Sequence, residues 1–276
     1  MPKALIVEDH QDQADVVAEL LRHKGFEPMI AATGTLGLKL AFEHRPDLIL
    51  LDLMLADIDG FEVCRKLRCE PETLTIPIVM VTALNGNEYR TQGFRVGANA
   101  YLTKPYGAQD LYHAIASAIS WRDRLDKLRL KGEIQLEMHS ESSFLDEVNE
   151  FLANLSAKTP LAPDQTHQLR QALMELGQNA IEWGNRHERD ALVNITYRIY
   201  DEYIEIIIAD QGPGFDPDSL EHAASPDDPL AHIEVREKLG LREGGFGMLI
   251  ARGMVDEMTY NNSGNEVTLI KRFRRD

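Results

Sequence analysis

The 276-residue sequence lacks most of the patterns that mark membrane spans, metal clusters and P-loops. No run of about 18 apolar residues occurs, so we expect no membrane-spanning helix. The nine histidines form no HExxH or similar metal spacing, and GxxxxGK[ST] is absent. Cys64 and Cys69 are the only cysteines and form no CxxC pair. The start, MPKALIVEDH, resembles no secretory signal, so we expect free thiols and a cytoplasmic protein.

Basic residues are scarce relative to acidic ones. The chain has 29 Lys and Arg against 45 Asp and Glu, which gives a net charge of −16, and most of the acidic excess follows residue 126. A DNA-binding output domain carries a basic face, so the acidic second half argues against direct contact with nucleic acid. The chain length suits two domains of ordinary size.

In the first half, short apolar runs alternate with amphipathic stretches of about 12 residues. This alternation predicts a doubly wound parallel sheet with helices on both faces. The carboxyl ends of parallel strands meet at one edge, where such folds bind their ligands. Each apolar run is followed there by polar residues: Glu8 and Asp9 after ALIV, Asp52 after DLILL, Thr82 after PIVMV, and Thr103 and Lys104 after AYL.

Three of these residues are carboxylates, and their number bears on metal binding. Each strand-end residue taken alone could be an ordinary turn residue. Glu8, Asp9 and Asp52 together would repel one another strongly without a cation, so a divalent ion is implied. Ligands that are all oxygen atoms favour Mg²⁺.

The motifs VED, DLMLADIDG, VTAL and LTKP closely resemble the receiver domain of two-component response regulators, a flavodoxin-like fold, over about residues 1–122. The resemblance implies that Asp52 accepts a phosphoryl group from a cognate histidine kinase. It implies that Glu8, Asp9, Asp52 and the backbone carbonyl of Met54 hold Mg²⁺. An aspartate nucleophile suits this chemistry because positioning and charge neutralisation carry phosphoryl transfer.

The same resemblance assigns roles to three further residues of this half of the chain. Lys104 would pair with the phosphoryl oxygens, Thr82 would hydrogen-bond to them, and Tyr101 would be the aromatic that turns inward as Thr82 moves. The Lys104–Pro105 peptide bond is expected to be cis. Ala56 stands where the family usually has proline, which predicts a looser loop without the loss of a catalytic group.

A helical pattern runs from Gln109 to about Lys131 and joins the two halves. Its charged end, residues 123–131, is interpreted as a linker. Three alternatives stay open for it: a dimer seam, a stiff arm that carries the signal, or a helix packed on its own domain. Two heptads are too few to choose among them.

Residues 132–276 group helices apart from a run of hairpin-like strands. Helices are expected around Phe144–Leu155 and over Pro163–Trp183, and strands are expected at EIQLEMH, LVNITYRIY, YIEIIIAD and NEVTLIKRF. This order predicts a two-layer α/β sandwich with a mixed, mainly antiparallel sheet.

The motif ELGQNAIE places Glu175, Asn179 and Glu182 on one face of the second helix, which could also be only its solvated side. Two glycine-rich motifs add to it: ADQGPGF, with Asp210, Gly212 and Gly214, and GGFGM, with Gly244, Gly245 and Gly247. Glycines just before a helix form an anion cradle of backbone N–H groups. The long polar stretch between the two motifs is interpreted as a mobile lid.

Together these motifs resemble the ATP-binding fold shared by histidine kinases, gyrase, Hsp90-type chaperones and anti-sigma-factor serine kinases, the last branch most of all. The resemblance implies that Asp210 accepts a hydrogen bond from the adenine amino group and that Asn179 holds the Mg²⁺ of Mg²⁺-ATP. Gly212 and Gly214 would let the lid move, the three later glycines would hold the phosphates, and Glu175 would be the general base.

The second half departs from this family in three places. Gly244 stands where relatives often have arginine, for which Arg242 could substitute. Gly264-Asn265 replaces a Gly-Thr pair, and Trp183 replaces a frequent histidine. ATP binding is therefore expected more firmly than phosphate transfer.

Three functions follow from these resemblances. The first is a serine/threonine protein kinase that is controlled by the receiver and acts on an anti-sigma antagonist in a partner-switching pathway. The second is a non-catalytic, ATP-dependent clamp that sequesters a sigma factor or its antagonist. A histidine autokinase is disfavoured because His113, His139 and His167 lie in no phosphoacceptor pattern. Both halves resemble modules that often form homodimers, so the oligomeric state stays open.

Overall fold

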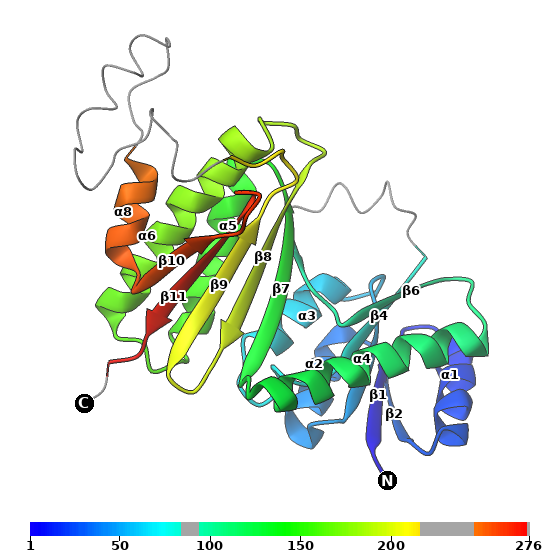
Figure 1. The fold of residues 1–276 in the computed structure, drawn as a ribbon. Helices are drawn as coiled ribbons and strands as arrows, with labels where there is room; N and C mark the ends of the chain where they lie inside the picture. Colours follow the sequence, from blue (N-terminus) through cyan, green and yellow to red (C-terminus); the bar gives the residue numbers. More distant parts are fainter. Residues whose placement is uncertain (84–93, 216–245, 275–276) are drawn as a thin grey trace. The chain divides into compact units, whose positions relative to one another are not determined.

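The computed structural model describes residues 1–83, 94–215 and 246–274 (Figure 1). It divides into two compact units, Met1–Gln135 and Leu136–Asp276. The border between the units falls inside strand β7 (Gly132–His139), four residues beyond the start of the predicted second domain. Among the described residues, no helix is both long and apolar enough to cross a membrane.

The first unit alternates strands and helices, as its sequence predicts. Its parallel sheet has the strand order β2-β1-β3-β4-β6. The elements are β1 (Lys3–Val7), α1 (Gln11–His23), β2 (Glu27–Ala31), α2 (Gly34–His44), β3 (Leu48–Asp52), α3 (Gly60–Arg68), β4 (Ile78–Thr82), β5 (Phe94–Val96), β6 (Ala100–Thr103) and α4 (Ala108–Leu128).

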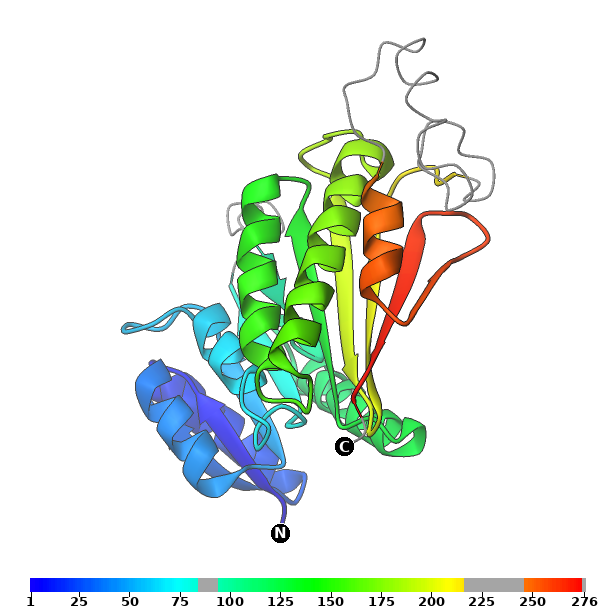
Figure 2. The same ribbon diagram turned by 90° about the vertical axis from the view of Figure 1, so that its left-hand side faces the viewer.

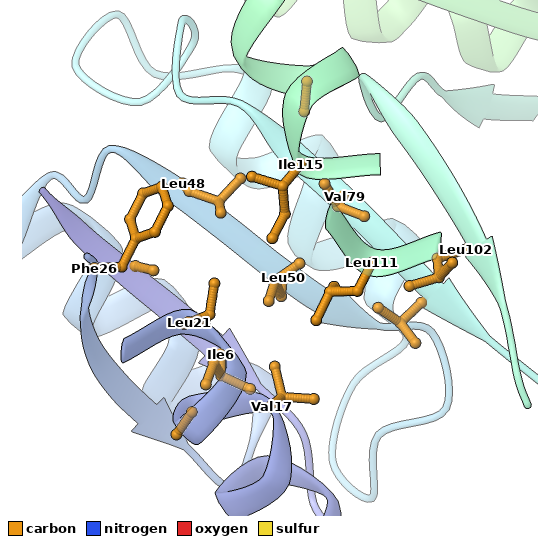
Figure 3. Close-up of a cluster of buried hydrophobic side chains, with 14 of the residues drawn as sticks. Ile6, Val17, Leu21, Phe26, Leu48, Leu50, Val79, Leu102, Leu111 and Ile115 are labelled. Atoms are coloured by element: carbon orange, nitrogen blue, oxygen red, sulfur yellow. The ribbon is translucent and has the colours of Figure 1, made fainter. Parts of the chain in front are cut away.

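Local capping explains where two of these helices begin. The Thr33 side chain accepts a hydrogen bond from Leu36 N at the start of α2, and Asp59 accepts one from Phe61 N at the start of α3. Such caps satisfy backbone N–H groups that have no partner within the helix. The core on one face of the sheet is formed by α1 and α4 packed on the central strands (Figure 3). It includes Ile6, Val17, Leu21, Leu50, Val79, Leu111 and Ile115.

Helix α4 runs to Leu128 and so carries part of the predicted linker. Its side chains Trp121 and Leu125 are buried. Trp121 Nε1 donates to Glu133 Oε1 at 3.1 Å, and Arg124 Nη2 donates to the same oxygen at 2.5 Å. Arg124, at the start of the linker segment, is therefore fixed to Glu133 within the first compact unit, and the three alternatives for the segment stay predictions.

The second unit is a sheet covered on one face by helices. Its strands follow the order β10-β11-β9-β8-β7, and the pairs β8–β9, β9–β11 and β10–β11 are antiparallel. After β7 the elements are α5 (Ser142–Ser156), α6 (Pro163–Asn179), a π-helical turn (Ala180–Gly184), β8 (Leu192–Ile199), β9 (Tyr203–Ala209), α8 (Gly247–Met254), β10 (Glu257–Tyr260) and β11 (Glu266–Arg272).

Strict alternation of side chains defines the two faces of this sheet. In β8 and β9 every second residue is buried, including Ile195, Tyr197, Ile206 and Ile208. Helices α5, α6 and α8 lie side by side over that face (Figures 1 and 2). The arrangement is the predicted two-layer α/β sandwich. The α-helix predicted over Pro163–Trp183 ends at Asn179, because the next five residues form the π-helical turn.

Candidate functional site

In the first unit, the polar residues predicted to converge do lie at one edge of the parallel sheet. Glu8 and Asp9 follow β1, Asp52 and Thr82 end β3 and β4, and Lys104 follows β6. Asp52 is only 5% exposed and Thr82 is fully buried. The strand order brings them together because β1, β3, β4 and β6 are consecutive neighbours in the sheet.

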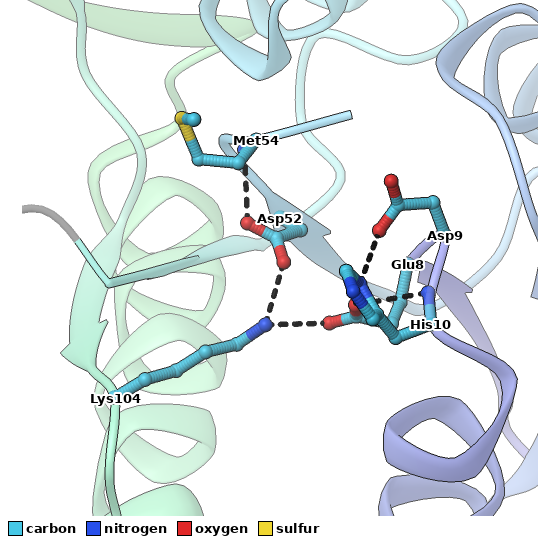
Figure 4. A network of polar contacts seen from close by, with 6 residues as sticks. All are labelled: Glu8, Asp9, His10, Asp52, Met54 and Lys104. Atoms are coloured by element: carbon cyan, nitrogen blue, oxygen red, sulfur yellow. Dashed lines mark hydrogen bonds and ion pairs between the residues drawn. The ribbon is translucent and has the colours of Figure 1, made fainter. Parts of the chain in front are cut away.

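Lys104 links the two most buried carboxylates of this edge (Figure 4). Its Nζ lies 2.6 Å from Asp52 Oδ2 and 2.7 Å from Glu8 Oε2. The other oxygen of Asp52 accepts a hydrogen bond from Met54 N at 2.9 Å. The carboxylate is thus fixed at both oxygens, by a cation on one side and by backbone on the other.

Burial and pairing set the electrostatics of this edge. Burial raises the pKa of Glu8, and the hydrogen bond from Lys104 offsets this only in part. Burial acts to lower the pKa of Lys104, but its hydrogen bonds to Asp52 and Glu8 outweigh that effect and raise the pKa. Lys104 therefore stays protonated at neutral pH and partly neutralises the carboxylates around it.

The expected switch residues and the cis bond can be located as well. The Lys104–Pro105 bond is cis, as predicted. Lys104 N donates to Thr82 O at 2.6 Å, so the chain after β6 is fastened to the end of β4. Tyr101 is 44% exposed in this structure.

Two residues near this edge were not singled out by the sequence. Asp57 accepts hydrogen bonds from Gly34 N at 2.8 Å and Thr35 N at 2.9 Å. Hydrogen bonds from Thr35 and Gly34 hold the pKa of Asp57 well below its usual range. His10 Nδ1 lies 2.7 Å from Asp9 Oδ1, and that contact raises the pKa of His10. In the sequence, the acidic run ADIDG is the signal that could have indicated the contacts of Asp57.

In the second unit, Glu175 and Asn179 of α6 lie next to Gly247 of α8. Gly247, the first residue of α8, lies so close to α6 that a Cβ on it would be 2.7 Å from Glu175 Oε2 and 3.7 Å from Asn179 Nδ2. Both polar side chains are half-buried, and no hydrogen bond to either is found among the described residues. Two hydrogen-bonding groups therefore face the start of a helix, where backbone N–H groups lack partners.

Asp210 follows β9 and lies against the π-helical turn. A Cβ on Gly184 would be 2.5 Å from Asp210 Oδ2 and 2.6 Å from Oδ1. Asp210 Oδ1 accepts a hydrogen bond from Gly212 N at 2.8 Å, and Asp210 N donates to Asn265 O at 3.0 Å. Burial raises the pKa of Asp210, which the Gly212 hydrogen bond counteracts only in part.

Glycine is required at two positions beside this loop. Gly214 and Gly264 have φ values of +75° and +73°, and a Cβ on either would overlap a backbone oxygen of the other segment. Asn265, the departure from the Gly-Thr pattern, donates from Nδ2 to Asp210 O at 3.4 Å. Gly244, Gly245, Arg242 and the polar stretch interpreted as a lid lie outside the described residues.

Comparison with known proteins gives each unit a family. Residues 4–116 match the response regulator receiver domain, and residues 139–271 match the histidine kinase-like ATPase domain. The chain is a response regulator receiver domain followed by a histidine kinase-like ATPase domain.

Curated relatives match about half of the chain. The DNA-binding dual master transcriptional regulator RpaA of Synechocystis is 38% identical over 134 residues, 49% of this chain and 56% of its own length. The response regulator PleD of Caulobacter vibrioides is 37% identical over 127 residues, 46% of this chain and 28% of its own length. The match thus spans about half or less of these relatives.

Two of the solved structures similar to the chain are described as receiver domains. A CheY-like receiver domain protein from Methanospirillum hungatei is 28% identical, with a TM-score of 0.39 over 45% of this chain and 98% of that one. The receiver domain of the sensor histidine kinase PA1611 from Pseudomonas aeruginosa, which has a magnesium ion in its active-site cleft, is 28% identical. Its TM-score is 0.39 over 43% of this chain and 98% of that one.

Proposed function

We propose that the receiver domain is phosphorylated on Asp52 by a histidine kinase and thereby controls the ATPase domain. The convergence of Asp52, Glu8 and Lys104 supports this role. Asp52 Oδ2 attacks the incoming phosphorus, the phosphohistidine P–N bond breaks, and the histidine nitrogen leaves with the electron pair. Lys104 Nζ, 2.6 Å from that oxygen, then stabilises the added negative charge.

The donors at this edge fit a magnesium ion. Oxygen ligands of Glu8, Asp9, Asp52 and the Met54 carbonyl are the type that Mg²⁺ prefers. One oxygen each of Glu8 and Asp9 and a ring nitrogen of His10 lie within 4.8 Å of one another, close enough to hold one small cation. A bound Mg²⁺ would neutralise phosphoryl oxygens during transfer.

We propose that the ATPase domain binds Mg²⁺-ATP between α6, α8 and the Asp210 loop. The observation that carries this is the close approach of Gly247 to Glu175 and Asn179, which brings the α8 N-terminus to two polar groups. A helix N-terminus attracts phosphate, and Asn179 would hold the metal that bridges the phosphates. Asp210 would accept the adenine amino group at the other end, and Gly212 and Gly214 would let the adjoining chain move.

Phosphate transfer to a serine or threonine of an anti-sigma antagonist is the function favoured for this site. Glu175 supports it, because a half-buried carboxylate without a hydrogen bond among the described residues can accept the proton of an incoming hydroxyl. That hydroxyl oxygen attacks the γ-phosphorus, and ADP leaves with the electron pair of the broken P–O bond.

Two further assignments complete the proposal. Gly244 and Gly245 would contact the phosphates of ATP. In the receiver domain, Thr82 and Tyr101 would change conformation when Asp52 is phosphorylated.

The second candidate is an ATP-dependent clamp that binds a sigma factor or its antagonist without transfer. Gly244 in place of the family's arginine favours it, because a cation for the transition-state charge is then missing at that position. Either function would belong to a partner-switching pathway.

One experiment separates the two functions. Full-length protein is mixed with radiolabelled ATP and an extract of its host, with and without acetyl phosphate. A labelled partner protein supports the kinase, and an unlabelled partner that co-purifies only with ATP supports the clamp. A wild-type protein that binds no ATP in calorimetry would refute both.

A further inference from the structure

Asn185 is a buried polar residue directly after the π-helical turn, and its side chain is satisfied at both ends. It is 5% exposed. Its Nδ2 donates to Ser140 Oγ at 2.7 Å and to Leu192 O at 3.0 Å. Its Oδ1 accepts a hydrogen bond from Gln211 N at 2.8 Å. A buried amide with three good hydrogen bonds holds its neighbours in one geometry.

The hydrogen bond to Asn185 Oδ1 comes from the backbone N–H of Gln211, the residue directly after Asp210. Gly184 lies so close to the Asp210 carboxylate that a Cβ on it would overlap both carboxylate oxygens, and the next residue, Asn185, accepts the hydrogen bond from Gln211 N. Two adjacent residues after α6 therefore lie next to two adjacent residues after β9, and Asn185 fixes the second of them by a hydrogen bond. The Gln211 side chain is fixed as well, because its Oε1 accepts a hydrogen bond from Leu192 N at 3.0 Å.

We infer that Asn185 is a positioning residue that orients Asp210 for recognition of the nucleotide base. The inference deepens the proposed function and rests on ATP binding at this site. Asn185 touches no nucleotide itself; it acts through the Gln211 peptide. Asparagine suits the position because its one side chain supplies two N–H donors and also a carbonyl acceptor. Leucine has a similar volume but neither group.

Base recognition can be measured separately from general stability. Purine riboside triphosphate has hydrogen where ATP has its amino group, so its affinity reports the contribution of phosphates and ring without the Asp210 contact. Wild-type protein should bind Mg²⁺-ATP at least about tenfold more tightly than this analogue in calorimetry, since hydrogen bonds to charged groups have that size. The measured quantity is the ratio of the two dissociation constants, that of the analogue divided by that of Mg²⁺-ATP.

In Asn185→Leu the ratio should fall at least about fivefold, towards one, while affinity for the analogue stays within about twofold. The matched control is Ser140→Ala. It removes one acceptor of Asn185 Nδ2 but leaves the bond to Gln211 N, so it should lower thermal stability and keep the wild-type ratio. If Asn185→Leu does not fold, Asn185→Ser, which withdraws the carbonyl from Gln211 N, replaces it.

Four outcomes would overturn parts of this reasoning, and they are distinguishable. A folded Asn185 variant with the wild-type ratio refutes the positioning role. An equal fall of the ratio in Ser140→Ala refutes it too, because generic loosening would then suffice. Wild-type protein that binds ATP and the analogue equally removes Asp210 from base recognition, and wild-type protein that binds neither refutes the proposed function itself.

Discussion

Substitution of Gly184 by alanine tests the proposed base-recognition site most directly. The added Cβ would lie 2.5 Å from Asp210 Oδ2 and 2.6 Å from Oδ1, well inside van der Waals contact. The carboxylate must move away by the order of 1 Å to relieve that overlap, which takes a normal hydrogen bond beyond its useful length. We therefore expect the contact between Asp210 and the adenine amino group to be lost.

The size of the effect follows from the contact that is lost. A hydrogen bond to a charged group contributes about 1.5–3 kcal/mol, so Mg²⁺-ATP should bind about 10- to 100-fold more weakly to Gly184→Ala in titration calorimetry. Gly253→Ala is the control, because among the described residues no atom beyond the adjoining backbone of α8 lies within 4 Å of the Cβ it would add. It should leave affinity unchanged and add up to about 1 kcal/mol of stability. Unchanged ATP affinity in a folded Gly184→Ala protein would refute the reasoning.

Four further predictions concern single residues. Asp52→Ala should abolish incorporation of phosphate from acetyl phosphate into the receiver domain; undiminished acid-stable labelling would contradict the assignment. Glu175→Gln should keep ATP binding but slow phosphate transfer by about 10²–10⁴, measured with a labelled partner protein; transfer at the full rate would exclude this base. Glu133→Ala should cost about 1–3 kcal/mol in urea unfolding, because the buried Trp121 N–H loses its acceptor. The preference for ATP over purine riboside triphosphate should fall as pH drops through the raised pKa of Asp210, since protonation removes the charged acceptor; a flat profile would argue against it.

The receiver site was accessible to sequence reasoning because topology collects its residues. Parallel strands place their carboxyl ends at one edge, so polar residues after β1, β3, β4 and β6 had to approach one another. The bridging position of Lys104 between Glu8 and Asp52 is a side-chain geometry that the pattern alone could not give.

The ATPase domain was harder to predict at the places where its backbone is irregular. A π-helical turn leaves no sequence period, so the helix over Pro163–Trp183 was expected to continue regularly. Strand β10 has only four residues, too few for a visible alternation. Asn185 looks like an ordinary loop residue in the sequence, since burial and three partners are properties of the folded chain.

The carboxylates of Asp52, which ends β3, and of Asp210, which follows β9, are held in opposite electrostatic settings. Asp52 lies 2.6 Å from the Lys104 ammonium, whereas Asp210 forms no ion pair among the described residues and has a raised pKa through burial. A carboxylate paired with a cation can accept an anionic phosphoryl group, because the cation offsets the added charge. A half-buried carboxylate without a cation gains most from an N–H donor that satisfies its oxygens. The difference supports the proposed roles: a nucleophile for phosphate at Asp52, and a hydrogen-bond acceptor for a neutral amino group at Asp210.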